Sequence, residues 1–214
     1  MKKYYKAVIA MLFLFSPILI SICYQQYSNK NEVHTYIDVF YKGTFPKDYD
    51  TLSKKEQESI EMAINTTKKQ LFLSYFKDSG LPVSKKQYVE LTKAYETKVS
   101  SLKYKIHVWK NKDCSLRVKI KTQQIPLMEL EEKATDAAIK EIKKKNVIRL
   151  NQASKIFTKH LVKEINDYRP KRKNGIITIT FINKNGSYVP KDMKKMIQQC
   201  NVVISDQFLN EIKK

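Results

Sequence analysis

The chain has 214 residues, enough for one domain with a substantial core, and a formal net charge of +20. Only four of its 41 basic residues are arginine, and its lysines are spread along the chain rather than gathered with aromatic residues. Because readers of base edges and phosphates favour the rigid guanidinium group, this composition argues against specific nucleic-acid binding.

The first 24 residues have the pattern of an export signal. Lys2, Lys3 and Lys6 precede an uncharged, largely apolar run over residues 7–24. As a helix this run would be about 27 Å long, near the lower limit for crossing a bilayer. The pattern predicts membrane contact through residues 7–24, with the body on the extracytoplasmic side of the cell membrane.

Three fates of this segment stay open at this stage. It would remain as an uncleaved anchor, present Cys23 for lipidation, or be cleaved as a secretory signal. Ile22 is bulky where a lipoprotein signal has a small residue, and Ser21 with Cys23 only nearly fits a cleavage site. Without the three N-terminal lysines, 38 basic and 21 acidic residues give the exported part a charge of +17.

Beyond a linker over residues 25–32, the sequence predicts one domain over residues 33–201 and a tail over residues 202–214. A short helix is expected over residues 33–41, before Gly43 and Pro46. Sequences typical of capping boxes, Ser53 to Glu56 and Ser84 to Gln87, predict helices over about residues 54–77 and 85–99.

The hydrophobic period then changes from 3.6 to 2, which indicates strands. Residues 104–109 and 114–121 alternate between apolar and mainly basic side chains, which predicts an antiparallel hairpin with one apolar and one basic face. Asn185-Gly186 predicts a second hairpin within residues 176–190.

Helices are expected over about residues 130–144, 151–168 and from residue 191 onward. The predicted class is therefore α+β: after the N-terminal membrane-spanning or signal helix, about six helices pack on a mostly antiparallel sheet made of two β-hairpins. The helices are expected to cover one face of that sheet.

Several short segments make the chain resemble an uncharacterised lipoprotein domain family of low-GC Gram-positive bacteria, catalogued as a domain of unknown function. They span about residues 33–196: Tyr41-Lys42-Gly43, Leu52-Ser53, Ser79-Gly80-Leu81, Leu102-Lys103-Tyr104, Val118 to Thr122, Ala134 with Asp136-Ala137-Ala138, and Val189 to Met193. Because these are turns, caps and core positions, the resemblance implies a fold and an envelope location and transfers no catalytic residue. Ile22 departs from the small residue that the family has before its lipidated cysteine.

No catalytic or cofactor motif is present. His34, His107 and His160 are far apart in sequence, and each of the four glycines is isolated at a turn, so neither a metal site nor a phosphate loop is predicted. His160 is expected to be a packed core histidine. Glu131 and Glu132 lie at a predicted helix start, where the helix dipole accounts for them. No enzyme activity and no cofactor are therefore expected.

The candidate binding residues are Lys105, His107 and Trp109, which share the basic face of the first predicted hairpin. An aromatic ring beside cations on an open face would grip a ligand or a partner, whereas the alternative is a tryptophan packed under a neighbouring loop or helix. Cys114 and Cys200 lie on predicted apolar faces and are compatible with a disulfide or with two small buried side chains.

The favoured function is a membrane-tethered, non-catalytic envelope domain. Its expected partners are the membrane and an anionic lipid or wall polymer, a peptide or another envelope protein. An enzyme with a site assembled from sequence-distant residues, or an auxiliary structural subunit, is the alternative. The sequence indicates no oligomeric state.

Overall fold

The protein structure, a computed structural model, describes residues 30–43, 53–55, 57–66, 80–170, 175–184 and 186–206. The expected anchor over residues 7–24, including Cys23, lies outside the described residues. Among the helices that are described, none has the length and apolar character needed to cross a bilayer.

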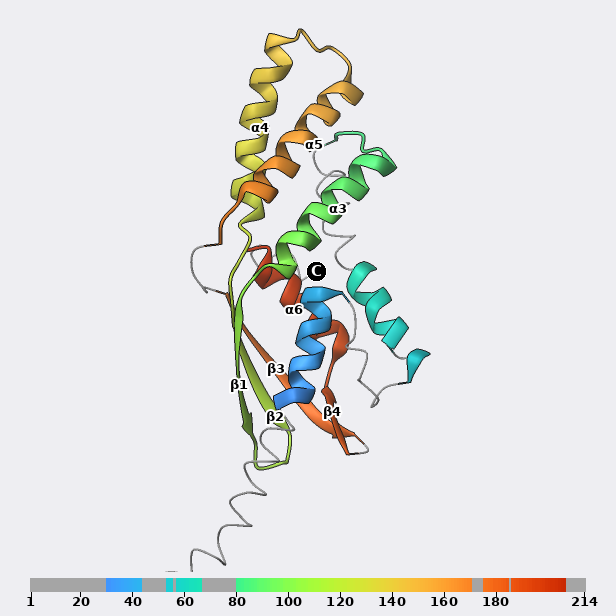
Figure 1. Cartoon of the computed structure of the whole chain (residues 1–214), viewed down its shortest axis with the longest axis vertical. Helices are drawn as coiled ribbons and strands as arrows, with labels where there is room; N and C mark the ends of the chain where they lie inside the picture. The colour runs from blue at the N-terminus through green and yellow to red at the C-terminus, as the bar shows by residue number, and fades with distance from the viewer. Residues whose placement is uncertain are drawn as a thin grey trace, which may run out of the picture.

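Four antiparallel strands form one sheet in the order β1-β2-β3-β4 (Figure 1). The predicted first hairpin is β1 (Tyr104–Lys110) and β2 (Leu116–Thr122), and the second is β3 (Gly175–Lys184) and β4 (Ser187–Pro190). The two hairpins join through β2 and β3, which pair from Leu116 opposite Phe181 to Thr122 opposite Gly175.

Six helices accompany the sheet within the described part of the chain. They cover residues 30–42, residues 54–55 with 57–66, α3 (Lys85–Ser100), α4 (Leu127–Lys144), α5 (Leu150–Asp167) and α6 (Met193–Ile204). The α+β class and the antiparallel sheet of two hairpins are therefore confirmed.

The capping box at the start of α3 is present in the structure. The Gln87 amide donates to Ser84 Oγ at 3.3 Å, and the Ser84 amide donates to Gln87 Oε1 at 3.1 Å. For the earlier box at Ser53, Glu56 lies outside the described residues, and so does the expected helix end near residue 77.

The helix over residues 30–42 covers the inner face of the sheet and runs along its length. Near its start, Glu32 accepts a hydrogen bond from the Tyr188 amide at 2.6 Å, beside the turn between β3 and β4. Near its end, the Tyr41 hydroxyl bonds to Thr122 at the opposite end of β2. Residue 30 therefore lies at the end of the sheet where the hairpins turn, which we call the turn end.

Helices α4 and α5 form a helical hairpin that projects from the other end of the sheet (Figure 1). Helix α3 is joined to α5 by Gln87, whose side-chain amide donates to Ser154 Oγ and Thr158 Oγ1, each at 3.0 Å. The ammonium group of Lys98 donates to the Asn166 and Tyr168 carbonyls, at 2.9 and 2.8 Å. These bonds hold the helical hairpin to the rest of the domain.

Helix α6 lies beside the edge of β3, and it extends to Ile204 rather than giving way to a tail at residue 202. Ile204 is fully buried, and its carbonyl accepts a hydrogen bond from the Ile125 amide at 2.7 Å. Gly175, at the start of β3, has no room for a side chain because a Cβ there would lie 2.7 Å from Val203 Cγ1. This close contact fixes where α6 meets the sheet.

Candidate functional site

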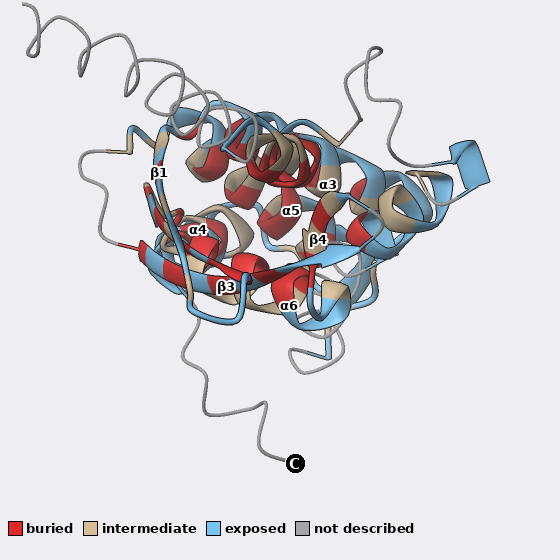
Figure 2. Cartoon of the chain, turned by 90° about the horizontal axis from the view of Figure 1, so that it is seen from below, coloured by how far each residue is buried: buried red, intermediate tan, exposed pale blue. Residues whose placement is uncertain are grey.

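The outer face of the sheet carries a set of basic and polar side chains that we call the basic face. It consists of Lys105, His107 and Trp109 on β1, Arg117, Lys119 and Lys121 on β2, and Thr178 and Thr180 on β3. Successive side chains of a strand point to opposite faces, so the residues between them turn inward. Figure 2 shows this alternation of buried and exposed positions along the strands.

The strand register places the basic face in three rows. Lys105 lies opposite Lys121, His107 opposite Lys119, and Trp109 opposite Arg117. The corresponding positions on β3 are Ile176, Thr178 and Thr180. Directly opposite side chains in such a ladder have Cβ atoms about 5 Å apart, so lysine faces lysine at short range.

This arrangement concentrates positive charge without compensation from within the sheet. The four strands contain no aspartate and no glutamate. Like charges directly opposite each other destabilise a sheet by some tenths of a kcal/mol per pair. A bound anion would relieve this repulsion, which makes the basic face chemically suited to anions.

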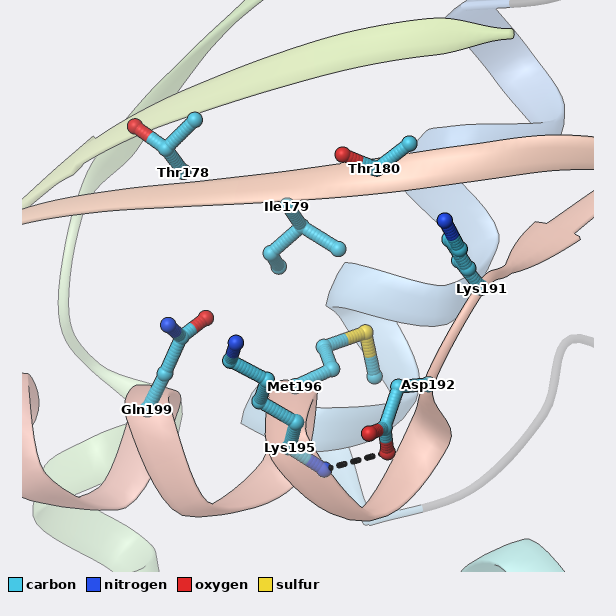
Figure 3. A pocket seen from close by; sticks show the side chains of 8 residues that line it. All are labelled: Thr178, Ile179, Thr180, Lys191, Asp192, Lys195, Met196 and Gln199. Atoms are coloured by element: carbon cyan, nitrogen blue, oxygen red, sulfur yellow. Dashed lines mark hydrogen bonds between the residues drawn. The ribbon is translucent and has the colours of Figure 1, made fainter.

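A cavity of about 470 Å³ extends the polar surface past the edge of β3 (Figure 3). It lies between β3 and α6, and its lining residues are Thr178, Ile179, Thr180, Lys191, Asp192, Lys195, Met196 and Gln199. The Asp192 carboxylate caps α6 by accepting from the Lys195 amide at 2.9 Å. The cavity therefore adds two lysines next to β3, while the side chains of Thr178 and Thr180 lie on the other side of the strand from Ile179 (Figure 3).

The structure brings Lys105, His107 and Trp109 together on one exposed face. Trp109 is 43% exposed, so it is not packed under a loop or helix. Sequence reasoning named these three residues and left out their cross-strand neighbours on β2, although the same alternation points to them. No local sequence pattern reveals the β2–β3 pairing or the position of α6 beside β3. The sequence therefore could not indicate that Thr178, Thr180, Lys191 and Lys195 lie next to these residues.

The disulfide that the sequence left open is absent, because Cys114 and Cys200 are both free. Cys114 does not lie on the apolar face of a strand: it is exposed in the turn between β1 and β2, with φ of 61°. The turn is fixed by Asp113, which accepts from the Ser115 amide at 3.0 Å, and β2 begins only at Leu116. Cys200 is buried in α6, and burial raises the pKa of its thiol to about 12.

The three histidines lie in separate parts of the fold. His160 is a half-buried partner of Glu141, at 2.8 Å between Nε2 and Oε2, rather than a core residue. Hydrogen bonds from Lys145 and then from His160 lower the pKa of Glu141 to about 2. His34 packs near the Tyr104 ring, and burial lowers its pKa. The described residues contain no group of histidine, cysteine and carboxylate side chains that could hold a metal ion.

A second hollow, of about 830 Å³, lies where α4 and α5 meet the sheet. It contains several ionisable groups: Glu129, Lys133, Glu164, Asp167, Arg169 and Asp206. Glu129 and Lys133 form an ion pair one helical turn apart, with both side chains more than half exposed to solvent. Asp206 accepts a hydrogen bond from Gln124 at 2.9 Å. The hollow thus combines one solvated ion pair with further carboxylates and an arginine.

Comparison with known proteins gives a likeness in fold. No family model and no curated protein sequence matches the chain. The chain is similar to the crystal structure of YcdA from Bacillus subtilis, described as a candidate lipoprotein, with a TM-score of 0.60 and 15% identity. The match covers 80% of this chain and 55% of that one, so the chain corresponds to little more than half of YcdA.

Proposed function

We propose that this chain is an extracytoplasmic, membrane-tethered, non-catalytic domain that binds an anionic wall polymer across its basic face. The observation that carries the proposal is the cluster of five basic side chains on β1 and β2, in which Lys105 lies opposite Lys121 and His107 opposite Lys119, on a sheet whose four strands contain no carboxylate. Natural sheets avoid such pairs unless another requirement outweighs their cost.

The extracytoplasmic location has separate support. Three lysines followed by the uncharged run over residues 7–24 are typical of an export segment. The fold is shared with a protein described as a candidate lipoprotein, and the sequence resembles a lipoprotein domain family. Envelope polymers that carry phosphate groups are among the anions available to a domain in that location.

The chemistry of the basic face favours a flexible polymer over a compact ligand. Five of the six residues contributed by β1 and β2 are lysine, arginine or histidine, spread over a flat surface. Lysine is a mobile, hydrated point charge that does not impose a fixed geometry on its partner. Trp109 adds an apolar surface, 43% exposed, against which a polymer unit could pack.

The test is binding of the full chain, in neutral detergent, to a polyglycerol phosphate at several salt concentrations. The variant combines Lys105→Gln, Lys119→Gln and Lys121→Gln. Log affinity falls as log salt concentration rises, and each lost phosphate contact should reduce the magnitude of this slope by about 1. The triple variant should therefore show a slope smaller in magnitude by up to about 3. The matched control carries Lys85→Gln, Lys86→Gln and Lys93→Gln on the exposed side of α3, with the same charge change.

The control variant should keep most of the slope. Equal losses in both variants would show that the charge acts diffusely and that the basic face is not the site. Binding that resists salt but disappears in Trp109→Ala would instead indicate a compact ligand held at Trp109. Turnover of the polymer by the wild-type chain would favour the enzyme alternative.

A further inference from the structure

The loop between α4 and α5 exposes apolar side chains at the end of the helical hairpin. Ile148 is 94% exposed and Leu150 is 65% exposed, and Ile148 is the most exposed of the large apolar residues in the described part of the chain. Asn146 ends α4 in the left-handed conformation, with φ of 49°, and the Val147 amide donates back to the Ile142 carbonyl at 3.1 Å. The backbone hydrogen bonds that end α4 involve neither Ile148 nor Leu150. The turn therefore does not require apolar residues at these two exposed positions.

Basic side chains surround these apolar residues. Lys143, Lys144, Lys145 and Arg149 lie within or next to the loop, and no acidic residue occurs from Ile142 to Lys163. We call residues 143–150 the tip. Glu141, just before the tip, pairs with Lys145 and leaves the other three basic groups of the tip in excess.

The tip is held on a firm support. The helical hairpin has a packed interior that includes Ala134, Ala138, Phe157 and Leu161. Near the tip, the bond between His160 and Glu141 joins α5 to α4 at 2.8 Å. The tip lies at the opposite end of the molecule from residue 30 (Figure 1).

We propose that the tip inserts its apolar side chains into the headgroup region of an anionic bilayer. An apolar patch with a basic surround is the combination that binds such interfaces, since each part contributes separately. The proposal does not depend on ligand binding at the basic face. The orientation rests on the membrane tethering proposed above: if the segment before residue 30 holds the chain to a bilayer, the tip reaches the same bilayer when the long axis of the domain lies along it.

This geometry has an energetic advantage. Membrane contacts of modest strength become stable when two of them act together, because the first raises the effective concentration of the second. The tether would thus make a weak tip contact persistent. Without the tip contact, the domain would be held only through the tether and could move away from the membrane surface.

The test uses the full chain reconstituted into vesicles, with a fluorescent probe at the tip. The chain has a single tryptophan, so Ile148→Trp in a Trp109→Phe background reports on the tip alone. In vesicles of phosphatidylglycerol and phosphatidylcholine, its emission should shift to shorter wavelength and be quenched by brominated lipid. In phosphatidylcholine alone, both effects should be much smaller.

Two controls make the test specific. Val89→Trp in the same background places the probe on an exposed position of α3 and should show little lipid quenching. Adding Lys143→Gln, Lys144→Gln and Arg149→Gln to the tip probe should lower the equilibrium constant for insertion by roughly 100-fold, at about 1 kcal/mol for each basic group. The three Lys→Gln changes on the basic face should leave the tip signal unchanged.

Some results would overturn the proposal. The first is a tip probe that stays fully accessible to iodide on anionic vesicles. The second is insertion of the tip probe into neutral vesicles to the same extent as into anionic ones. The third is lipid quenching of the Val89→Trp probe equal to that of the tip probe. A blue shift that depends on protein concentration without vesicles would assign the tip to contact with a second copy.

Discussion

Glu131 has a carboxyl group that the fold keeps half-buried, although it lies in the second turn of α4 between the buried Leu130 and the exposed Glu132. Burial raises the pKa of this carboxyl to about 7. Proximity to the helix N-terminus favours a charged carboxylate, so the sequence pattern alone would predict a lowered pKa for Glu131. The adjacent Glu132 is exposed, which shows how sharply one position along a helix changes the environment.

Replacing Glu131 should change how stability depends on pH. A carboxyl whose folded pKa lies above its unfolded value near 4.5 stabilises the fold fully below pH 4.5, and this contribution is lost as the pH rises through about 7. Glu131→Gln should remove that loss and raise the free energy of unfolding at pH 8 by roughly 2 kcal/mol. Urea unfolding between pH 4.5 and 8 measures this, and Glu132→Gln is the matched control. A similar pH profile in wild type and Glu131→Gln would contradict it.

At the scale of elements, the contact between Gly175 and α6 decides how the last helix meets the sheet. A Cβ on Gly175 would lie 2.7 Å from Val203 Cγ1, 3.0 Å from Thr122 Cγ2 and 3.1 Å from Gln124 Cγ. Gly175→Ala should therefore cost about 1–3 kcal/mol of stability through overpacking. Val203→Ala removes the nearest methyl group, so the double variant should cost less than the sum of the single variants. Urea unfolding of all four proteins gives the coupling, and additive costs would show that Val203 is not the limiting contact.

The elements with local signals could be predicted from the sequence, and those that depend on distant contacts could not. The capping box at Ser84, the alternation in β1 and β2 and the Asn185-Gly186 turn each placed an element to within a few residues. The β2–β3 pairing, which completes the basic face, joins residues about 60 apart and leaves no mark in either segment.

Cys114 differs from its expected place for a local reason, whereas His160 and the end of α6 differ because of contacts that are distant in sequence. Cys114 was assigned to a strand because the alternation runs through it, but the hydrogen bonds of Asp113 and Ser115 make it part of the turn. His160 lies on an apolar helical face and bonds to Glu141 on α4, a partner 19 residues away. The helical end at Ile204 is fixed by the Ile125 amide, which is remote in sequence.

At the scale of the whole molecule, the path of the first described helix sets which end faces a tether. Its start lies at the turn end of the sheet, and the tip of the helical hairpin lies at the far end. We predict that the chain fractionates with membranes and that protease added to wall-less cells digests the body, because the N-terminal pattern is typical of an export segment. An uncleaved anchor would keep Cys23→Ala membrane-bound. Release of that variant would show lipidation, and recovery of the body in the cytoplasm would end the envelope proposal.

The two edges of the sheet have different protection, and this difference bears on self-association. The edge strands are β1 and β4. The short β4 pairs only with the last four residues of β3, and α6 packs beside the start of β3, whereas the longer β1 has no partner beyond it in the described part of the chain. An unpaired edge is a template on which a second sheet can grow. If two copies joined through β1, their outer faces would merge into one surface with twice the positive charge.

Electrostatic repulsion between copies therefore opposes pairing through β1, an edge that none of the described helices covers. Lys105 and Lys110 lie on the edge strand itself, and the lysines of β2 are one strand away. A polyanion bound across two such faces would neutralise this repulsion and bring the edges within reach of each other. Ligand binding and clustering of the domain on an envelope polymer would then be thermodynamically linked, with the same lysines controlling both.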